Sequence, residues 1–362
     1  MIAASTDGAR IVASEGWYAL PTAVDGTVHE ATQEWTELLA ERRAAAAPVD
    51  PPRLKRALSR GVPVNLRAEV WLEFSGAAAR LRAHPDVYET LCSRIAADRA
   101  ARTPPASPAK PAAGGGSSSS AGGEGGPPSP PASPAKPLSH AQRVLEQVEK
   151  DLRRTDIGSE PERLAGMRRV LCAYAAFNPD VGYVQGMNFI VVALLGVLTE
   201  PEAFWMLVLV VQDWLPEHFA KAMVGNHIDC RVLSRLTTEH LPRLAAHLRK
   251  LDVTVQLLTT RWFLCLWSSV VPTAALHRLW DLLFTAGPPS TMQVALACMQ
   301  LTEDWLVSAA DIGAALAGAK EALRTAEGGE KLLDLALYSA VTPRSRWTSH
   351  LGEAHARRRT DD

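Results

Sequence analysis

Residues 178–188 read Asn-Pro-Asp-Val-Gly-Tyr-Val-Gln-Gly-Met-Asn, and an apolar stretch begins immediately afterwards at Phe189. Gly182 and Gly186 fall on either side of the central part of this segment. Glycine adopts backbone conformations that other residues avoid, and it lets another backbone approach closely. The segment therefore predicts a loop that leads into an apolar helix.

Tyr183 and Gln185 stand between those two glycines. Their spacing directs the two side chains in roughly opposite directions, so one can pack in the core while the other faces outward. An outward amide offers both a donor and an acceptor, which is what orienting a water molecule requires. Taken alone, the same pattern also describes an ordinary loop with a polar cap.

Upstream, an apolar stripe at helical spacing runs up to a charged pair. The stripe consists of Val144, Leu145, Val148 and Leu152. Arg154 lies two residues beyond the end of the stripe, roughly 200° around a helix, and so points away from the core. Asp151, three residues before Arg154, lies on a neighbouring part of the same face and can steady the guanidinium. Such an arginine can reach a partner's phosphate site, although most pairs with this spacing are surface ion pairs.

The rest of the chain has the apolar spacing of helices. Apolar residues recur at three- and four-residue intervals, and strand-like alternation is nearly absent. We expect helices over residues 189–197, 202–214, 230–236, 241–251, 260–268, 273–284 and 291–308. No repeat of fixed period occurs, which argues against a regular solenoid. The pattern predicts an irregular all-α fold.

One boundary interrupts this pattern. From about residue 102 to residue 137 the composition changes to proline, alanine, glycine and serine. The octet Pro-Pro-Ala-Ser-Pro-Ala-Lys-Pro occurs at 104–111 and again at 130–137. Such a segment cannot bury enough apolar surface to offset the entropy of ordering. We expect a disordered insertion that acts as a spacer, with binding to a proline-reading module as the alternative.

The overall composition excludes several classes of protein. Hydrophobic residues make up 47% of the chain, charged residues make up 21%, and the formal net charge is −1. This balance is typical of a soluble globular protein and supplies no positive field for binding nucleic acid. The five cysteines form no Cys-x-x-Cys pair, so we expect reduced thiols in an intracellular protein. Glu200-Pro201-Glu202 interrupts the apolar run after Phe189, so no transmembrane segment is expected.

The sequence also lacks the motifs of a self-sufficient active site. It contains no GxxxxGK[ST] phosphate loop, no HExxH, no GxSxG and no clustered cysteine and histidine set. We therefore expect no metal or cofactor of its own. If this protein promotes chemistry, it does so inside the active site of another protein.

Three segments together resemble the motifs of the TBC family, both in their order along the chain and in their residues. They contain Arg67-x-x-x-Trp71, Val148-x-x-Asp151-x-x-Arg154 and Tyr183-x-Gln185. The second segment has valine where the family has isoleucine, and the third stands within the phrase Gly-Tyr-Val-Gln-Gly-Met-Asn-Phe that is characteristic of the family. Similarity continues downstream to Gly287, so the resemblance covers roughly residues 57–310.

The resemblance implies an all-α fold of two helical subdomains and a role as a GTPase-activating protein. TBC domains stimulate GTP hydrolysis by Rab GTPases through two side chains that they insert into the partner's active site. By resemblance, Arg154 is the arginine finger and Gln185 is the glutamine finger. The residues expected in supporting roles are Asp151, Tyr183, Arg67 and Trp71. Such a protein completes the active site of its partner, which itself binds the GTP and Mg. It is not an enzyme in its own right.

The same resemblance divides the chain. We expect a partly helical N-terminal extension over residues 1–56 and a TBC domain over 57–310, interrupted by the insertion at 102–137. A C-terminal helical extension with a basic tail is expected over 311–362.

The implied partner is a GTP-bound Rab-type small GTPase. We expect a monomeric, cytoplasmic regulator of vesicle trafficking that reaches endomembranes through this partner. The alternative is a catalytically silent scaffold that binds a Rab and stimulates nothing. Asp156 bears on that choice, because it stands where the family often has an aromatic residue or histidine and puts a negative charge near the path of the nucleotide.

Overall fold

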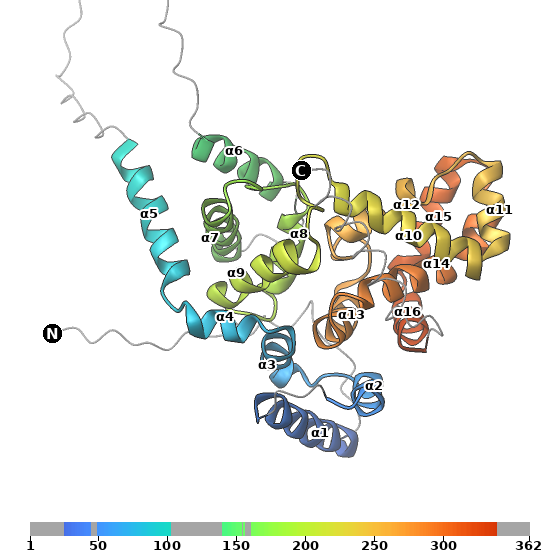
Figure 1. Ribbon diagram of the computed structural model, residues 1–362, viewed down its shortest axis with the longest axis horizontal. Helices are drawn as coiled ribbons and strands as arrows, with labels where there is room; N and C mark the ends of the chain where they lie inside the picture. The colour runs from blue at the N-terminus through green and yellow to red at the C-terminus, as the bar shows by residue number, and fades with distance from the viewer. Residues whose placement is uncertain (1–24, 45–48, 103–139, 154, 156–160, 339–362) are drawn as a thin grey trace, which may run out of the picture.

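The chain is helical throughout the part that the computed structural model describes, which is residues 25–44, 49–102, 140–153, 155 and 161–338. This part contains sixteen α-helices, one π-helical turn and no strand. Figure 1 shows the blue-to-green N-terminal helices on one side of the molecule and the yellow-to-red C-terminal helices on the other. The predicted all-α fold of two helical subdomains is confirmed. The insertion, the start of the chain and the basic tail lie outside the described residues.

The first subdomain is built around α7. It comprises α1 (Asp25–Ala44), α2 (Pro51–Arg60), α3 (Val64–Ser75), α4 (Ala77–Ala83), α5 (Val87–Arg102), α6 (His140–Leu152), α7 (Pro161–Phe177), α8 (Met187–Leu194), α9 (Glu200–Leu209) and the turn η1 (Val210–Trp214). Helices α5, α6, α8 and α9 all lie against α7. Met167, Leu171 and Tyr174 of α7 are fully buried, because their spacing puts them on its inner side.

The second subdomain is built around α14. It comprises α10 (Val224–His240), α11 (Pro242–Lys250), α12 (Val255–Leu264), α13 (Thr273–Ala286), α14 (Ser290–Ser308), α15 (Ile312–Arg324) and α16 (Ala326–Tyr338). All the other helices of this subdomain contact α14. A helix that is apolar all round must be buried, and residues 294–299 of α14 are fully buried.

Polar residues fix where several helices begin. Glu202 accepts the backbone N–H of Thr199 at 2.8 Å, as part of a capping box at the start of α9. Thr254 caps α12, and Asp311 accepts a backbone N–H at 2.8 Å at the start of α15. Each cap satisfies a backbone donor that the first turn of a helix leaves without an intrahelical partner.

The helix predicted over residues 260–268 is wrong at both ends. Helix α12 instead occupies Val255–Leu264. Leu266 and Trp267 have φ angles of 45° and 61°, in the left-handed region, so the helix cannot continue through them.

The helix predicted over residues 202–214 consists of two elements. Helix α9 ends at Leu209, and η1 follows as a π-helical turn. The N–H of Leu215 donates to the carbonyl oxygen of Val210 at 2.9 Å, which is the wider spacing of a π-turn. The helix predicted over 230–236 is also longer than expected, because α10 extends beyond it in both directions.

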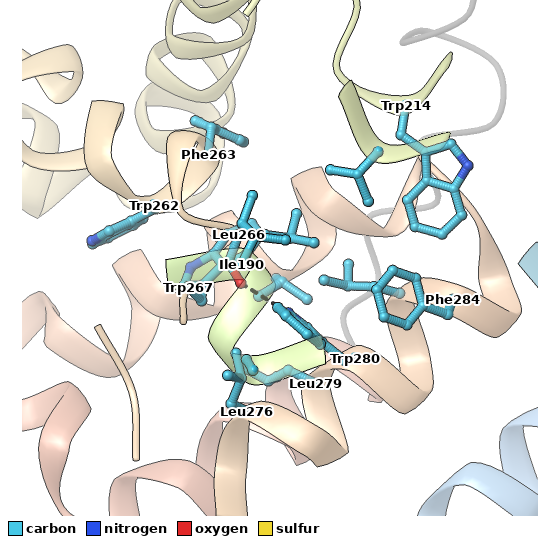
Figure 2. Packing of buried hydrophobic residues seen from close by; sticks show 14 of the residues in the cluster. Ile190, Trp214, Trp262, Phe263, Leu266, Trp267, Leu276, Leu279, Trp280 and Phe284 are labelled. Carbon is cyan, nitrogen blue, oxygen red and sulfur yellow. Dashed lines mark hydrogen bonds between the residues drawn. The ribbon is translucent and has the colours of Figure 1, made fainter. Parts of the chain in front are cut away.

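The two subdomains meet where α3 lies against α13. The ring of Trp71 in α3 contacts Trp280 and Phe284 of α13 edge-on, with centroids 5.6 Å and 5.1 Å apart. Figure 2 shows Trp280 close to Ile190 of α8 and to Leu266, whose carbonyl oxygen accepts the indole N–H of Trp280 at 2.9 Å, and shows Phe284 on the side of Trp214. Aromatic pairs of this kind stabilise a core by about 0.5–1.5 kcal/mol each beyond the area they bury.

No described helix combines the length and hydropathy that crossing a bilayer requires. All five cysteines are free thiols, and four of them are buried. Burial raises the pKa of the Cys298 thiol far above its ordinary value, so this thiol stays protonated as part of the core.

Candidate functional site

The loop between α7 and α8 presents Gln185 to solvent. The loop begins with a tight turn, in which the N–H of Gly182 donates to the carbonyl oxygen of Asn178 at 2.8 Å. Gly182 and Gly186 have φ angles of 64° and 114°, conformations that favour glycine. The two glycines therefore supply the left-handed conformations that the loop needs, and the second immediately precedes α8.

Tyr183 points in the opposite sense and is fixed to the end of α6. Its hydroxyl donates to Oδ2 of Asp151 at 2.8 Å. Asp151 is only 2% exposed, and the side-chain amide of Gln147 also donates to Oδ2, at 3.3 Å. A buried carboxylate is costly unless hydrogen bonds compensate it, so this cluster ties the loop to α6.

Asn188 completes the connection from the other side. Its Oδ1 accepts the N–H of Gly186 at 3.1 Å, and its Nδ2 donates to Oγ1 of Thr155 at 2.7 Å. The Thr155 hydroxyl donates in turn to the carbonyl oxygen of Asp151 at 2.7 Å. Asn188 and Thr155 are both buried, so this network is shielded from water.

Arg154 and Asp156 lie outside the described residues. Their neighbour Thr155 is held by the network just described, and Arg153, on the other side of Arg154, is exposed. The same buried hydrogen bonds thus fix both the residue that follows Arg154 in the sequence and the loop that carries Gln185.

Arg67 and Trp71 lie in a different cluster, at the junction of the subdomains. The guanidinium of Arg67 donates to both carboxylate oxygens of Asp281, at 3.0 Å and 3.2 Å, and also to the carbonyl oxygen of Val62 at 3.1 Å. The indole N–H of Trp71 donates to Oδ1 of the same aspartate at 2.7 Å. These contacts join α3 to α13 and therefore hold the two subdomains together.

A neutral histidine packs beside this ion pair. The ring of His277 meets Trp71 edge-on, with centroids 5.8 Å apart. Burial, together with the positive charges of Arg67 and Arg163, lowers the pKa of His277 to about 3. His277 therefore remains uncharged at neutral pH and adds no second cation next to Arg67.

Sequence reasoning assigned no role to Asn188, Thr155 or Asp281. The first two stand inside or beside the quoted motifs, so their polar side chains next to apolar runs were a usable signal. Asp281 stands among apolar residues of α13, and a carboxylate at such a position signals a buried partner. Only the three-dimensional structure identifies that partner, because Arg67 is 214 residues away in the sequence.

The Gln185 loop also lies against α12. A Cβ atom added at Gly186 would come within 2.9 Å of the carbonyl oxygen of Leu264, the last residue of that helix. Glycine is therefore required at Gly186 both for its φ angle and for the space available.

Gly186→Ala is expected to destabilise the protein by about 1–3 kcal/mol and to displace the loop, because the new methyl group adds a clash to an unfavourable φ angle. Gly182→Ala is the matched control. Its Cβ would come no closer than 4.0 Å to other atoms, so it should cost only the left-handed conformation, about 1–2 kcal/mol. Thermal unfolding of both variants measures the difference, and equal losses of stability would contradict the close-approach argument.

Known proteins support the same fold. A family model described as the Rab-GTPase-TBC domain matches residues 133–307. Growth hormone-regulated TBC protein 1 from Homo sapiens is 29% identical over 267 residues, which span 72% of this chain and 66% of that protein. The crystal structure of the Chlamydomonas flagellar RabGAP TBC domain matches with a TM-score of 0.64 and 26% identity, and the match covers 86% of this chain and 92% of that one. The matched residues, 133–307, carry a TBC domain.

Two further similarities define what this TBC domain shares with its relatives. Small G protein signaling modulator 3 from Bos taurus is 38% identical over 169 residues, which are 45% of this chain but only 23% of that protein. The chain therefore spans about a quarter of the length of that relative. The Ypt/Rab-GAP domain of Gyp1p, at 15% identity and a TM-score of 0.61, shares the TBC fold.

In this TBC domain the predicted site residues divide into two groups. Asp151 and Tyr183 lie together with the loop that carries Gln185, whereas Arg67 and Trp71 lie at the subdomain junction. The catalytic and supporting roles of all these residues stay predictions, as do the domain boundaries.

Proposed function

We propose that this TBC domain accelerates GTP hydrolysis by a Rab-type small GTPase, with Arg154 as arginine finger and Gln185 as glutamine finger. The observation that carries the proposal is the exposed Gln185 on a loop fixed through Tyr183 and Asn188 to buried groups. The partner would supply GTP and Mg, and the activator would be a monomer without a cofactor. Its partner would bring it from the cytoplasm to endomembranes, where it would regulate vesicle trafficking.

The carboxamide of Gln185 suits the alignment of the attacking water. Its oxygen can accept a hydrogen bond from the water while its nitrogen donates one to a neighbouring acceptor. The hydrogen bonds of the folded protein already hold the loop that carries Gln185. Little reorganisation of this side chain is therefore needed when the partner binds. An inserted arginine then stabilises the charge that develops on the phosphoryl oxygens in the transition state.

Asp151 and Tyr183 would act as positioning residues in this mechanism. They touch the two segments that carry the fingers, and they do not need to touch nucleotide. Arg67 and Trp71 would keep the two subdomains in register, so that a partner meets a single rigid surface. Asp281 joins this second group, because both side chains donate to its carboxylate.

A catalytically silent Rab-binding scaffold is the second candidate. Asp156 favours it, because a negative charge two residues after Arg154 would repel the phosphates of an approaching nucleotide. The two candidates differ in one measurable respect, since a scaffold binds a GTP-loaded Rab and leaves its hydrolysis rate unchanged.

The test is single-turnover GTP hydrolysis on a panel of purified Rab GTPases with wild type and Gln185→Ala. Wild type should accelerate one or a few members, and Gln185→Ala should lower that stimulated rate by about 10²-fold, the typical cost of removing one preorganised polar group. Gln33→Ala is the matched control, because Gln33 is an exposed glutamine on α1. Tight binding of wild type to a GTP-loaded Rab without acceleration would instead establish the scaffold.

A further inference from the structure

Helix α12 exposes one face that is not needed by the core. Leu257 is 52% exposed, and Arg261, one turn further along on the same face, is exposed as well. The other side of the helix supplies the buried residues Leu258, Trp262 and Phe263. Residues 257 and 261 therefore lie on the side of α12 that faces away from its buried residues.

This exposed face is continuous with the loop that carries Gln185. The Arg261 guanidinium lies over the ring of Phe189, 5.4 Å from its centroid, and Phe189 stands in the first turn of α8. Leu264, at the end of α12, lies against Gly186. Gln185, Phe189, Arg261 and Leu257 thus follow one another over adjoining elements.

Arg261 is held in place on this surface. Its Nε donates to the hydroxyl of Ser269 at 2.9 Å, and the ring of Phe189 provides a cation–π contact. Burial raises the pKa of the nearby Cys265 thiol, and Arg261 is close enough to act on it in the opposite direction. A guanidinium fixed in this way loses little conformational entropy when a partner carboxylate binds to it.

We propose that Leu257, Arg261 and Phe189 form a docking strip for the small GTPase whose nucleotide meets Gln185. The proposal rests on the function proposed above. A GTPase that places its nucleotide at Gln185 covers the surface next to that loop, and the strip is continuous with it. Arginine and aromatic side chains are enriched at protein interfaces, and arginine is among the residues that contribute most to binding energy, while the exposed Leu257 adds apolar area beside them.

The strip also specifies the chemistry of the surface that it fits. Leu257 requires an apolar contact, and Arg261 requires an acceptor such as a carboxylate about one helical turn away. The strip is separate from the chemical step, so it should affect the affinity for the GTPase and the choice among GTPases. It should leave the rate of hydrolysis within the complex unchanged.

The experiment compares Leu257→Asp with Leu316→Asp in the full chain. Leu316 is the matched control, because it is an exposed leucine, 41% accessible, on α15, which lies against α14 and α16. The readouts are the Kd for each Rab of the panel loaded with a non-hydrolysable GTP analogue, and kcat and KM for stimulated hydrolysis. Leu257→Asp should raise Kd and KM by about tenfold or more at unchanged kcat, as expected for a central interface residue. Leu316→Asp should leave all of these values unchanged.

Arg261→Ala provides a second test, with Ser269→Ala as its control. Ser269→Ala removes the same hydrogen bond and keeps the charge, so an effect of Arg261→Ala alone assigns the role to the guanidinium. Thermal unfolding of each variant verifies that the fold is intact. Wild-type affinity in both Leu257→Asp and Arg261→Ala would overturn the docking strip.

The result for wild type separates this inference from the proposed function. Acceleration by wild type together with unchanged behaviour of both Leu257→Asp and Arg261→Ala overturns the strip alone. Binding by wild type without acceleration overturns the catalytic proposal, and the Kd comparison still decides the strip. Absence of both binding and acceleration across the panel overturns both.

Discussion

Arg154→Ala is expected to reduce the stimulated rate of GTP hydrolysis by about 10³-fold or more, because arginine fingers typically contribute about 10³–10⁵ in rate. The guanidinium would be lost from a site where the phosphoryl and leaving-group oxygens gain charge in the transition state. Affinity for the GTP-loaded partner should change far less than the rate. Single-turnover kinetics with a Rab that responds to wild type, together with Kd on the non-hydrolysable analogue, separate these two effects.

Two variants make this result specific. Arg153→Ala removes the neighbouring exposed arginine and the same unit of charge, and it should retain most of the acceleration. Arg154→Lys keeps the charge but loses the planar fork of donors, so it should recover only a small part of the rate. Equal losses in Arg153→Ala and Arg154→Ala would indicate a general electrostatic effect and would rule out a finger.

Asp281→Ala is expected to lower the free energy of unfolding by about 3–5 kcal/mol, the usual cost of breaking a buried ion pair by removing one partner. The side chains of Arg67 and Asp281 are 3% and 1% exposed, so the arginine would be left as an uncompensated charge in the core. Trp71 would lose its acceptor as well. Denaturant unfolding followed by tryptophan fluorescence measures the loss.

Asp213→Ala is the matched control for that experiment. Asp213 pairs with Arg80 on the surface, where the two side chains are 42% and 34% exposed. Removal of such an exposed pair typically costs about 0–1 kcal/mol. A destabilisation by Asp281→Ala no larger than that of Asp213→Ala would show that the subdomain junction does not depend on the ion pair.

Patterns within a few turns of helix were enough to predict the fold class. Residues 294–299 of α14 are apolar on every side of the helix and fully buried, and the start of α8 follows directly from the glycines of the preceding loop. The prediction failed where tertiary contacts decide the backbone. No local signal indicates that Leu266 and Trp267 adopt left-handed conformations, because both are apolar residues that suit a helix equally well.

The candidate site was predictable only in part, for the same reason. The sequence placed Tyr183 and Gln185 on opposite sides of one loop, and the structure shows one half-buried and the other exposed. It did not indicate that Tyr183 would bond to Asp151, because the two residues meet only once α6 and α8 are packed together. Hydrogen bonds between distant segments depend on the arrangement of helices, which periodicity does not specify.

The pairing of Arg67 with Asp281 also constrains the order in which this protein can be made. The two residues are separated by 214 positions, so the ribosome needs roughly 10–40 s after adding Arg67 before it adds Asp281. Until then the charged side chain of Arg67 has no carboxylate partner in the nascent first subdomain, although it is buried in the folded protein. This half of the chain therefore cannot complete its packing before α13 has been synthesised, and an isolated fragment that ends before α13 would lack the carboxylate that its own core requires.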